Sequence, residues 1–333
     1  MGLPRLRYLA ATALTFSLAC GGKGNGPVDP TPQPSAPAIA CPADLTVREV
    51  RGAVQAVTYP APTVSGGAAP VTVNCSPGSG SDFRLGATAV ACSATDAQAR
   101  AATCSFTVTL TGFALGAAKF LAAGDSLTEG ENGRIRILDI PNAYPTKLQE
   151  ALDAAYPGQN LRVINRGISG WPIERTAEEL PGELAADRPD AVLLLSGYNN
   201  LLNECGRGPV NTTDCGAAIN AIGDGVREVI RKSREWRVSY VFVSTLTPPG
   251  PVGPGSKDRR ISNDAIVETN VRIRQIVAGN AATLVDVYPL FLGHEADYIE
   301  ADGLHLRPGG SQVVAEAFFA AIQNTVKQTP LDR

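Results

Sequence analysis

Two patterns of hydrophobic and polar positions divide the chain. From residue 39 to 112 the apolar residues come in brief alternating runs, among them "PVTVNC", "TAVACSATD" and "CSFTVTL", separated by clusters of glycine, proline and serine. Alternation of apolar and polar positions is typical of strands that bury one face. Several such runs, spaced by roughly ten residues, predict a small all-β sandwich.

From residue 117 the apolar runs become nearly continuous, as in "AKFLAAG", "LRVINRG", "AVLLLSG", "VSYVFVST" and "ATLVDV", and segments with helical periodicity lie between them. Continuous runs are typical of parallel strands buried on both faces. The order predicts a doubly wound α/β domain over residues 117–329, with a mainly parallel five-stranded sheet. Ligands of such sheets bind beyond the carboxyl ends of the strands, so we expect the chemistry there.

The first 38 residues differ from both patterns. Residues 1–19 combine Arg5 and Arg7 with the short apolar run "YLAATALTFSLA". A basic start followed by a short apolar core is typical of an export signal. Residues 20–38 are rich in glycine and proline without apolar periodicity, which predicts an extended linker.

The "SLAC" end of this signal resembles the signal of bacterial lipoproteins, in which the cysteine, here Cys20, is lipidated and becomes the first residue. Ser17 stands where such signals usually carry leucine, so cleavage without lipidation is an alternative. Gly21 after the cysteine favours the outer membrane. We therefore expect an outer-membrane lipoprotein of a bacterial cell envelope, anchored to the membrane through Cys20, or else a secreted protein.

Composition excludes several classes of function. The net charge is −3 without a cluster of basic residues, which argues against a nucleic-acid partner. No apolar stretch reaches the roughly 18 residues of a membrane-spanning helix. With two histidines, no CxxC pair and no glycine-rich nucleotide motif, we expect neither a metal nor a cofactor.

The cysteines predict disulfides, because six remain after Cys20 and an even number in an exported chain favours pairing. Cys205 and Cys215 flank the stretch "GRGPVNTTD" and are predicted to pair with each other. The other four lie in the sandwich, where three connectivities are open: Cys41, Cys75, Cys92 and Cys104.

Four segments near strand ends carry residues suited to acyl transfer. They are "GDSLTEG" with Ser126, "NRGISG" with Gly167, "SGYNN" with Asn199, and "ADGLHL" with Asp302 and His305. Taken singly, each has an ordinary structural explanation as a turn, a cap or a buried histidine. Together they supply a hydroxyl nucleophile, a histidine base, a carboxylate that orients the base, and N–H donors for an oxyanion.

This set of blocks resembles the SGNH hydrolases, also called GDSL esterases. The resemblance implies a flavodoxin-like α/β/α fold and a serine esterase without a cofactor. It implies a catalytic triad of Ser126, Asp302 and His305. It also implies an oxyanion hole formed by Ser126, Gly167 and Asn199.

The chain departs from the family pattern at one position, since Asn200 stands where the third block usually has aspartate. That acid is expected to support the loop, so the departure bears on how Asn199 is positioned. His294 is a second histidine and a rival for the role of base. Trp171 and the Pro/Gly-rich segment 247–260 are candidates for the rim of the substrate pocket.

The stretch "CSPGSGSDFRLGATAVACSATDAQARAATCSFTV" resembles the hyalin repeat (HYR) module, an immunoglobulin-like extracellular domain. Such modules act as spacers or as adhesion elements. The resemblance therefore implies two alternatives for residues 39–112, namely a spacer or a domain that binds a surface ligand.

The sequence as a whole predicts an exported serine esterase that hydrolyses short-chain acyl or acetyl esters through an acyl-enzyme on Ser126. Alternatives within the family are a carbohydrate O-acetylesterase, a lysophospholipase or a thioesterase, with a small-molecule, glycan or lipid ester as substrate. An alternative of another class is a surface adhesion protein without catalysis.

Overall fold

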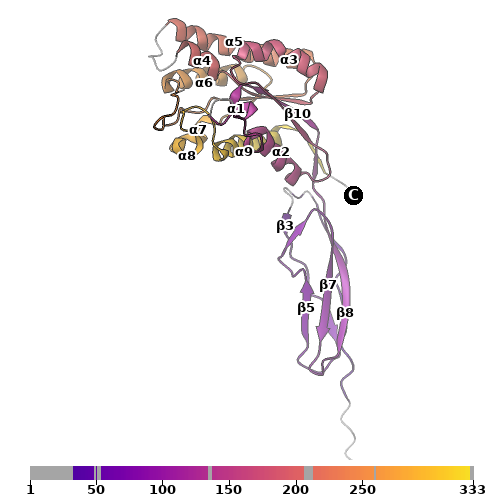
Figure 1. The fold of residues 1–333 in the computed structure, drawn as a ribbon. Helices are drawn as coiled ribbons and strands as arrows, with labels where there is room; N and C mark the ends of the chain where they lie inside the picture. Colours follow the sequence, from indigo (N-terminus) through magenta and orange to yellow (C-terminus); the bar gives the residue numbers. More distant parts are fainter. Residues whose placement is uncertain are drawn as a thin grey trace, which may run out of the picture.

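The computed structural model describes residues 33–330 except 49, 51–53, 134–136, 206–212 and 259. The predicted signal peptide, the lipidation site Cys20 and most of the predicted linker lie outside the described residues. The strand-rich segment and the α/β segment lie end to end, and the strand-rich part projects below the other (Figure 1).

The N-terminal segment is built from short strands, as predicted. They are β1 (Ala38–Ala40), β2 (Leu45–Val47), β3 (Val54–Ala56), β4 (Thr63–Ser65), β5 (Thr72–Ser76), β6 (Asp82–Arg84), β7 (Gly86–Thr95) and β8 (Ala101–Leu110). Four strands form a sheet in the order β2-β8-β7-β5, and β1–β4 and β3–β6 form two-stranded sheets. Alternate side chains of β7 and β8, such as Val90, Phe106 and Val108, are buried in a core of their own.

Three disulfides are present among the described residues. Two of them, Cys41–Cys104 and Cys75–Cys92, lie in the strand-rich segment and resolve the three open connectivities. Cys75 and Cys92 are directly opposite each other on β5 and β7. The third, Cys205–Cys215, confirms the predicted pair. Disulfides persist in oxidising compartments, so they indicate an extracellular or envelope protein.

The second segment is a doubly wound α/β domain, which confirms the predicted fold class. Its strands are β10 (Lys119–Gly124), β11 (Arg162–Gly167), β12 (Ala191–Leu195), β13 (Tyr240–Ser244) and β14 (Thr283–Val285). They form one sheet in the order β11-β10-β12-β13-β14, and every pair is parallel. The helices are α1 (Ser126–Glu129), η1 (Ile140–Asn142), α2 (Tyr144–Ala155), α3 (Ile173–Asp187), α4 (Tyr198–Glu204), α5 (Thr213–Glu235), α6 (Asn263–Ala278), α7 (Tyr288–Phe291), α8 (Glu295–Tyr298) and α9 (Pro308–Thr325).

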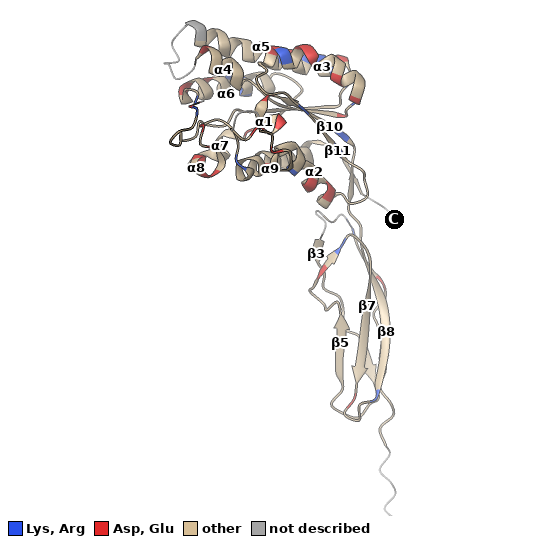
Figure 2. Cartoon of the chain, viewed as in Figure 1, with Lys and Arg blue, Asp and Glu red and all other residues tan. Residues whose placement is uncertain are grey.

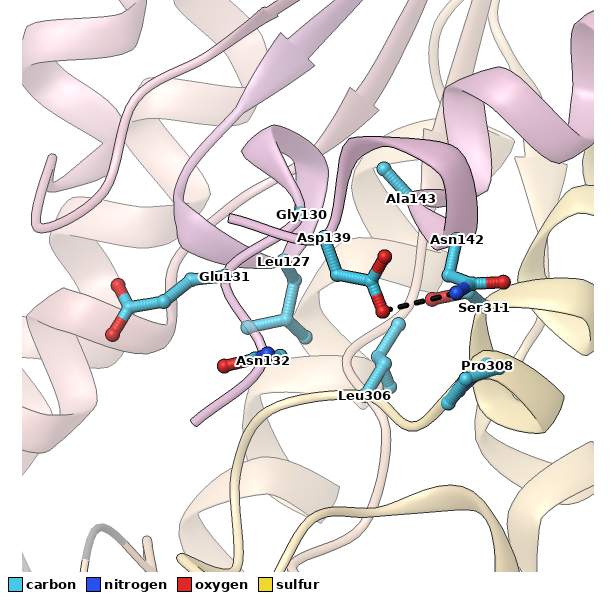
Figure 3. Close-up of a pocket in the computed structure, with 10 residues that line it drawn as sticks. All are labelled: Leu127, Gly130, Glu131, Asn132, Asp139, Asn142, Ala143, Leu306, Pro308 and Ser311. Atoms are coloured by element: carbon cyan, nitrogen blue, oxygen red, sulfur yellow. Dashed lines mark hydrogen bonds between the residues drawn. The ribbon is translucent and has the colours of Figure 1, made fainter. Parts of the chain in front are cut away.

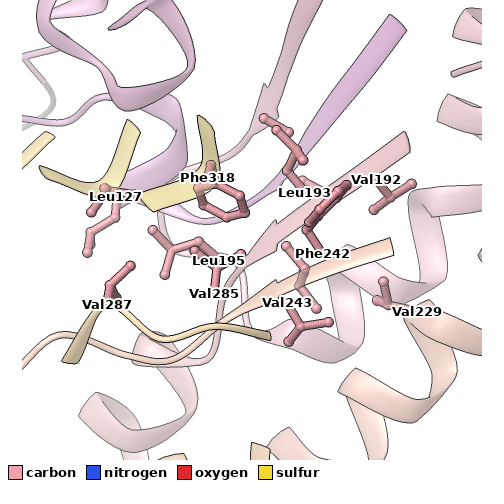
Figure 4. Close-up of a cluster of buried hydrophobic side chains, with 14 of the residues drawn as sticks. Leu127, Val192, Leu193, Leu195, Val229, Phe242, Val243, Val285, Val287 and Phe318 are labelled. Atoms are coloured by element: carbon pink, nitrogen blue, oxygen red, sulfur yellow. The ribbon is translucent and has the colours of Figure 1, made fainter. Parts of the chain in front are cut away.

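The helices cover both faces of the sheet. Helices α3, α5 and α6 lie on one face, and α2 and α9 lie on the other (Figure 1). Successive residues of a strand face opposite sides, so Val192 of β12 lies toward Val229 of α5 while Leu195 lies toward Phe318 of α9 (Figure 4). These side chains are fully buried, and each contributes about 1.5–3 kcal/mol of burial free energy. The packing fixes the strand ends on which the site is built.

The segment between the two parts is held by the end of the chain. Strand β9 (Phe113–Leu115) pairs antiparallel with β15 (Gln328–Pro330). The N–H of Gly116 also donates to the carbonyl of Lys327 at 2.8 Å. The C-terminal strand therefore anchors the connection from the strand-rich segment to the first strand of the α/β sheet.

Charged residues are unevenly distributed. They gather on helices such as α3 and α5, whereas the long strands of the N-terminal segment carry few of them (Figure 2). Within the part of the chain that the structure describes, no helix combines the length and the apolar character needed to cross a membrane.

Candidate active site

Ser126 stands at the turn from β10 into α1. Asp125 is the N-cap of that helix, and its Oδ1 accepts the N–H of Leu127 at 3.2 Å. A Cβ on Gly124 would lie 2.1 Å from the carbonyl oxygen of Leu195, so only glycine fits where β10 ends. The capping role thus falls to Asp125, and the hydroxyl of Ser126 is left for another partner.

That partner is His305, which lies 179 residues further along the chain. The Nε2 atom of His305 is 2.9 Å from Ser126 Oγ, and its Nδ1 atom is 2.6 Å from Asp302 Oδ2. The other oxygen, Asp302 Oδ1, accepts the N–H groups of Leu304 and His305 at 3.0 and 3.1 Å. The side chains of the serine, the histidine and the aspartate are nearly inaccessible to solvent. The structure therefore brings together these three predicted residues in one hydrogen-bonded chain.

The pKa values of two carboxyl groups at this site, those of Asp302 and Asp125, are shifted in opposite directions. Burial tends to raise the pKa of Asp302, but the hydrogen bond and the charge of His305 lower it below its ordinary value overall. Burial raises the pKa of the fully buried Asp125 to about 7, against the opposing effects of the Leu127 N–H and the charge of His305. Asp302 is therefore the carboxylate that stays ionised beside the imidazole.

The side-chain amide of Asn199, a predicted oxyanion donor, is held in place. Asn199 occupies the second position of α4, and its Nδ2 donates to the carbonyl oxygen of Trp171 at 3.0 Å. An amide NH₂ has two hydrogens, so this bond fixes the group and leaves one hydrogen for an oxyanion.

Gly167 does not fit the role of oxyanion donor, because its N–H donates to Asn165 Oδ1 at 2.9 Å. A Cβ on Gly167 would lie 2.3 Å from the Glu129 backbone nitrogen, so this glycine lets β11 pack against α1. Gly170, which follows shortly after, has φ +84° and open space where a Cβ would stand. Among the described residues its N–H has no hydrogen-bond partner. We therefore propose Gly170, in place of the expected Gly167, as the backbone donor.

The turn that carries Gly170 is fixed on both sides. The N–H of Ser169 donates to Glu129 Oε2 at 2.6 Å, which ties the turn to the helix of Ser126. The carbonyl of Trp171 accepts from Asn199 on the other side. Gly170 therefore lies between the segments that carry the serine and the asparagine, where a backbone donor is needed.

A comparison with protein-family models agrees with this geometry. The model of the GDSL-like lipase/acylhydrolase family matches residues 122–313, which is more than half of the chain. The chain belongs to the GDSL-like lipase/acylhydrolase family. It is therefore an ester-hydrolysing enzyme. The model of the HYR domain matches residues 29–110, which confirms the second resemblance.

The relatives of this GDSL hydrolase are distant in sequence. An arylesterase from Vibrio mimicus is 25% identical over 201 residues, covering 60% of this chain and 84% of that protein. A solved lipase/acylhydrolase from Enterococcus faecalis has a TM-score of 0.49 and 20% identity, covering 63% of this chain and 97% of that one. A solved acetylxylan esterase from Geobacillus stearothermophilus has a TM-score of 0.48 and 20% identity, covering 62% and 94%.

Asn200, the residue at which this GDSL hydrolase departs from the family pattern, is buried and uses both ends of its amide. Its Oδ1 accepts the N–H of Ile173 at 3.0 Å, and its Nδ2 donates to Glu174 Oε2 at 2.7 Å. An aspartate at this position could accept the first hydrogen bond but could not donate the second.

Glu131 is a residue near the hydrolase triad that the sequence pattern does not single out. It is buried, and its Oε2 lies 3.8 Å from His305 Nε2. It also lines a pocket with Asn132 and Asp139, and Figure 3 shows these side chains beside the loop that leaves α1. In the same pocket, Asn142 Nδ2 donates to Asp139 Oδ2 at 3.0 Å. The lining of this pocket is mixed, since it also includes apolar side chains such as Leu306 and Pro308.

The remaining sequence candidates lie as follows. His294 is exposed and stacks on Tyr298, with ring centroids 5.3 Å apart, so it is not the histidine that meets Ser126. Trp171 is half-buried below the guanidinium of Arg175. The described part of the 247–260 segment packs against the loop of Asp302, where the N–H of residue 250 donates to the carbonyl of residue 303 at 3.0 Å.

Proposed function

We propose that this chain hydrolyses short-chain carboxylic esters through an acyl-enzyme on Ser126. The observation that carries the proposal is the chain of hydrogen bonds from Ser126 Oγ to His305 Nε2, at 2.9 Å, and from His305 Nδ1 to Asp302 Oδ2, at 2.6 Å. A serine hydroxyl becomes a useful nucleophile only when a base removes its proton, and this geometry provides that base.

The first half-reaction forms the acyl-enzyme. Ser126 Oγ attacks the carbonyl carbon of the ester while its proton passes to His305 Nε2. Asp302 keeps the ring oriented and stabilises the imidazolium through Nδ1. The oxyanion receives hydrogen bonds from the N–H groups of Ser126 and Gly170 and from the Asn199 amide. The tetrahedral intermediate then collapses, and the alcohol leaves with the proton of Nε2.

The second half-reaction releases the acid. A water molecule loses a proton to His305 Nε2 and attacks the acyl carbon. The same donors hold the second oxyanion, and Ser126 leaves with the proton from the imidazolium. No metal or cofactor is needed in either half.

The proposed preference for short acyl groups rests on Glu131, a buried residue whose Oε2 lies 3.8 Å from His305 Nε2. Packing a long alkyl chain against a carboxyl group is unfavourable, because a polar group that loses water needs a replacement hydrogen bond that the alkyl chain does not provide. The arylesterase from Vibrio mimicus supports an ester as the substrate.

We further propose that the enzyme acts in the cell envelope. The three disulfides support a place outside the cytosol. Anchoring through a lipidated Cys20 would tether the hydrolase to a membrane, and the HYR module would act as a spacer between the anchor and the hydrolase.

The test uses purified protein spanning residues 21–333 and the acetyl, butyryl, octanoyl and dodecanoyl esters of p-nitrophenol. We expect kcat/KM to be highest for acetyl or butyryl esters, and Ser126→Ala to lower it by at least about 10³-fold. Rates that increase up to the dodecanoyl ester would contradict the short-chain preference. Full activity in Ser126→Ala would contradict the acyl-enzyme. If folded wild type hydrolyses none of these esters, the surface-binding alternative is the one to pursue.

A further inference from the structure

Two neighbouring amides on α4 hold the segment that leads into α3. Asn199 Nδ2 donates to the carbonyl of Trp171 at 3.0 Å, and Asn200 Oδ1 accepts the N–H of Ile173 at 3.0 Å. Residues 171 and 173 closely follow Gly170, the proposed backbone donor. The two donors that come from different segments, Gly170 and Asn199, are therefore linked through these bonds.

A third hydrogen bond joins Asn200 to the side chain of Glu174. Asn200 is only 7% exposed, and its Nδ2 donates to the Oε2 of Glu174 at 2.7 Å. Glu174 lies in the first turn of α3 and is an exposed residue. A bond from an amide to a carboxylate is stronger than one between neutral groups. Asn200 is thus held at both ends by the first turn of α3.

We propose that Asn200 and Glu174 form a positioning pair that fixes the Gly170 N–H and the Asn199 amide relative to each other. The inference rests on the proposed function, because it concerns donors to the oxyanion of that reaction. Both ends of the Asn200 amide bind α3 and not Ser126, so the pair is not assigned a contact with the substrate. The pair acts through the two donors.

Asn200 contributes an amide and Glu174 contributes a carboxylate, so the pair can be tested by exchanging the amide and the carboxylate between the two positions. With Asn200→Asp alone, one carboxylate oxygen would still accept the Ile173 N–H, but the other would face Glu174 Oε2 at about the present 2.7 Å. Two ionised carboxylates at that separation repel each other and move apart. With Glu174→Gln added, the glutamine Nε2 can donate to the carboxylate introduced at position 200, and the link is restored in the opposite direction.

The experiment measures kcat and KM for p-nitrophenyl acetate in wild type, Asn200→Asp, Glu174→Gln and the double variant. We expect Asn200→Asp to lower kcat by about tenfold or more with KM changed by less than about twofold, since oxyanion donors act in the transition state. Glu174→Gln keeps an acceptor and should lose no more than about threefold. The double variant should recover to within about threefold of wild type.

A matched pair of surface variants guards against a general effect on folding. Glu178 is an exposed glutamate one turn further along α3 and pairs with Arg175 rather than with α4. Glu174→Ala should lower kcat by about fivefold, whereas Glu178→Ala should stay within about twofold of wild type. Neither replacement removes a buried side chain.

The proposal is overturned if Asn200→Asp retains the kcat of wild type, or if Glu174→Ala and Glu178→Ala behave alike. It is also overturned if the double variant has the melting temperature of wild type and the low kcat of Asn200→Asp. Failure of the proposed function would give a different result. In that case wild type would show no ester hydrolysis that is lost in Ser126→Ala.

Discussion

At the scale of single residues, Asp302 both carries the negative charge beside His305 and fixes the orientation of the imidazole ring. Its Oδ2 holds His305 Nδ1 while its Oδ1 is occupied by two backbone N–H groups. In Asp302→Asn the amide would donate to Nδ1, so the proton would move to Nε2, which could then no longer accept from Ser126. We expect kcat to fall by about 10⁴-fold, the loss known for the same change in a serine protease. Steady-state hydrolysis of p-nitrophenyl acetate checks this.

The pH dependence of that loss follows from the lowered pKa of Asp302. An acid whose pKa is depressed by folding contributes stability above its unfolded value, near about 4, and loses it as the pH falls through the folded value. The carboxylate is therefore present throughout the range from about pH 6 to about pH 9. Protonation of Asp302 should therefore cause no loss of wild-type kcat within that range, and a pH–rate profile of wild type checks this. A loss of kcat between about pH 6 and about pH 9 that is traced to protonation of Asp302, for example by infrared spectroscopy of its carboxyl group, would contradict the assigned role.

The sequence could predict the reacting residues better than the backbone donor. Ser126, Asp302 and His305 are chemically distinctive and lie at strand ends, so the pattern identified them as candidates. "NRGISG" offers two glycines of identical chemistry, Gly167 and Gly170. Only the bond from Gly167 to the side chain of residue 165 and the positive φ of Gly170 distinguish them, and both depend on tertiary structure.

At the scale of elements, α4 is a short helix that carries both Asn199 and Asn200 and is fixed at its end by a disulfide. Cys205 caps α4 and is bonded to the buried Cys215 of α5. Replacing both cysteines by alanine should destabilise the domain by about 2–3 kcal/mol, because the loop that the disulfide closes is released. It should also lower kcat several-fold. Guanidinium unfolding and kinetics measure the two effects.

The matched control for this prediction is Cys75→Ala with Cys92→Ala, which removes a disulfide from the strand-rich segment. That change should leave kcat near the wild-type value, since α4 is untouched. Equal losses of kcat in both double variants would show that the effect does not come from α4.

Periodicity predicted the larger elements correctly because the five parallel strands are buried and read as nearly continuous apolar runs. It could not predict α1, a helix of four residues in which Ser126 is the first. Nor could it predict the pairing of β9 with β15, since the two strands lie far apart in the chain and each is only three residues long. Such short elements form only when tertiary contacts complete them.

At the scale of the whole molecule, the chain combines a GDSL hydrolase domain of α/β architecture with a strand-rich module. This module has its own small core and two disulfides. The division into two parts could be predicted from the change between alternating and nearly continuous apolar runs. The pairing of the four cysteines in the first part could not be predicted, because it depends on which strands lie next to each other. The long strands of the HYR module carry few charges (Figure 2).

The central claim is that Ser126 is an activated nucleophile in the folded protein. The most direct measurement is labelling of the protein spanning residues 21–333 with a fluorophosphonate, followed by peptide mass mapping, with Ser126→Ala alongside. We predict one modified residue, Ser126, and no labelling of the variant. A folded wild-type protein that remains unlabelled, or that is labelled at another serine, would contradict the mechanism.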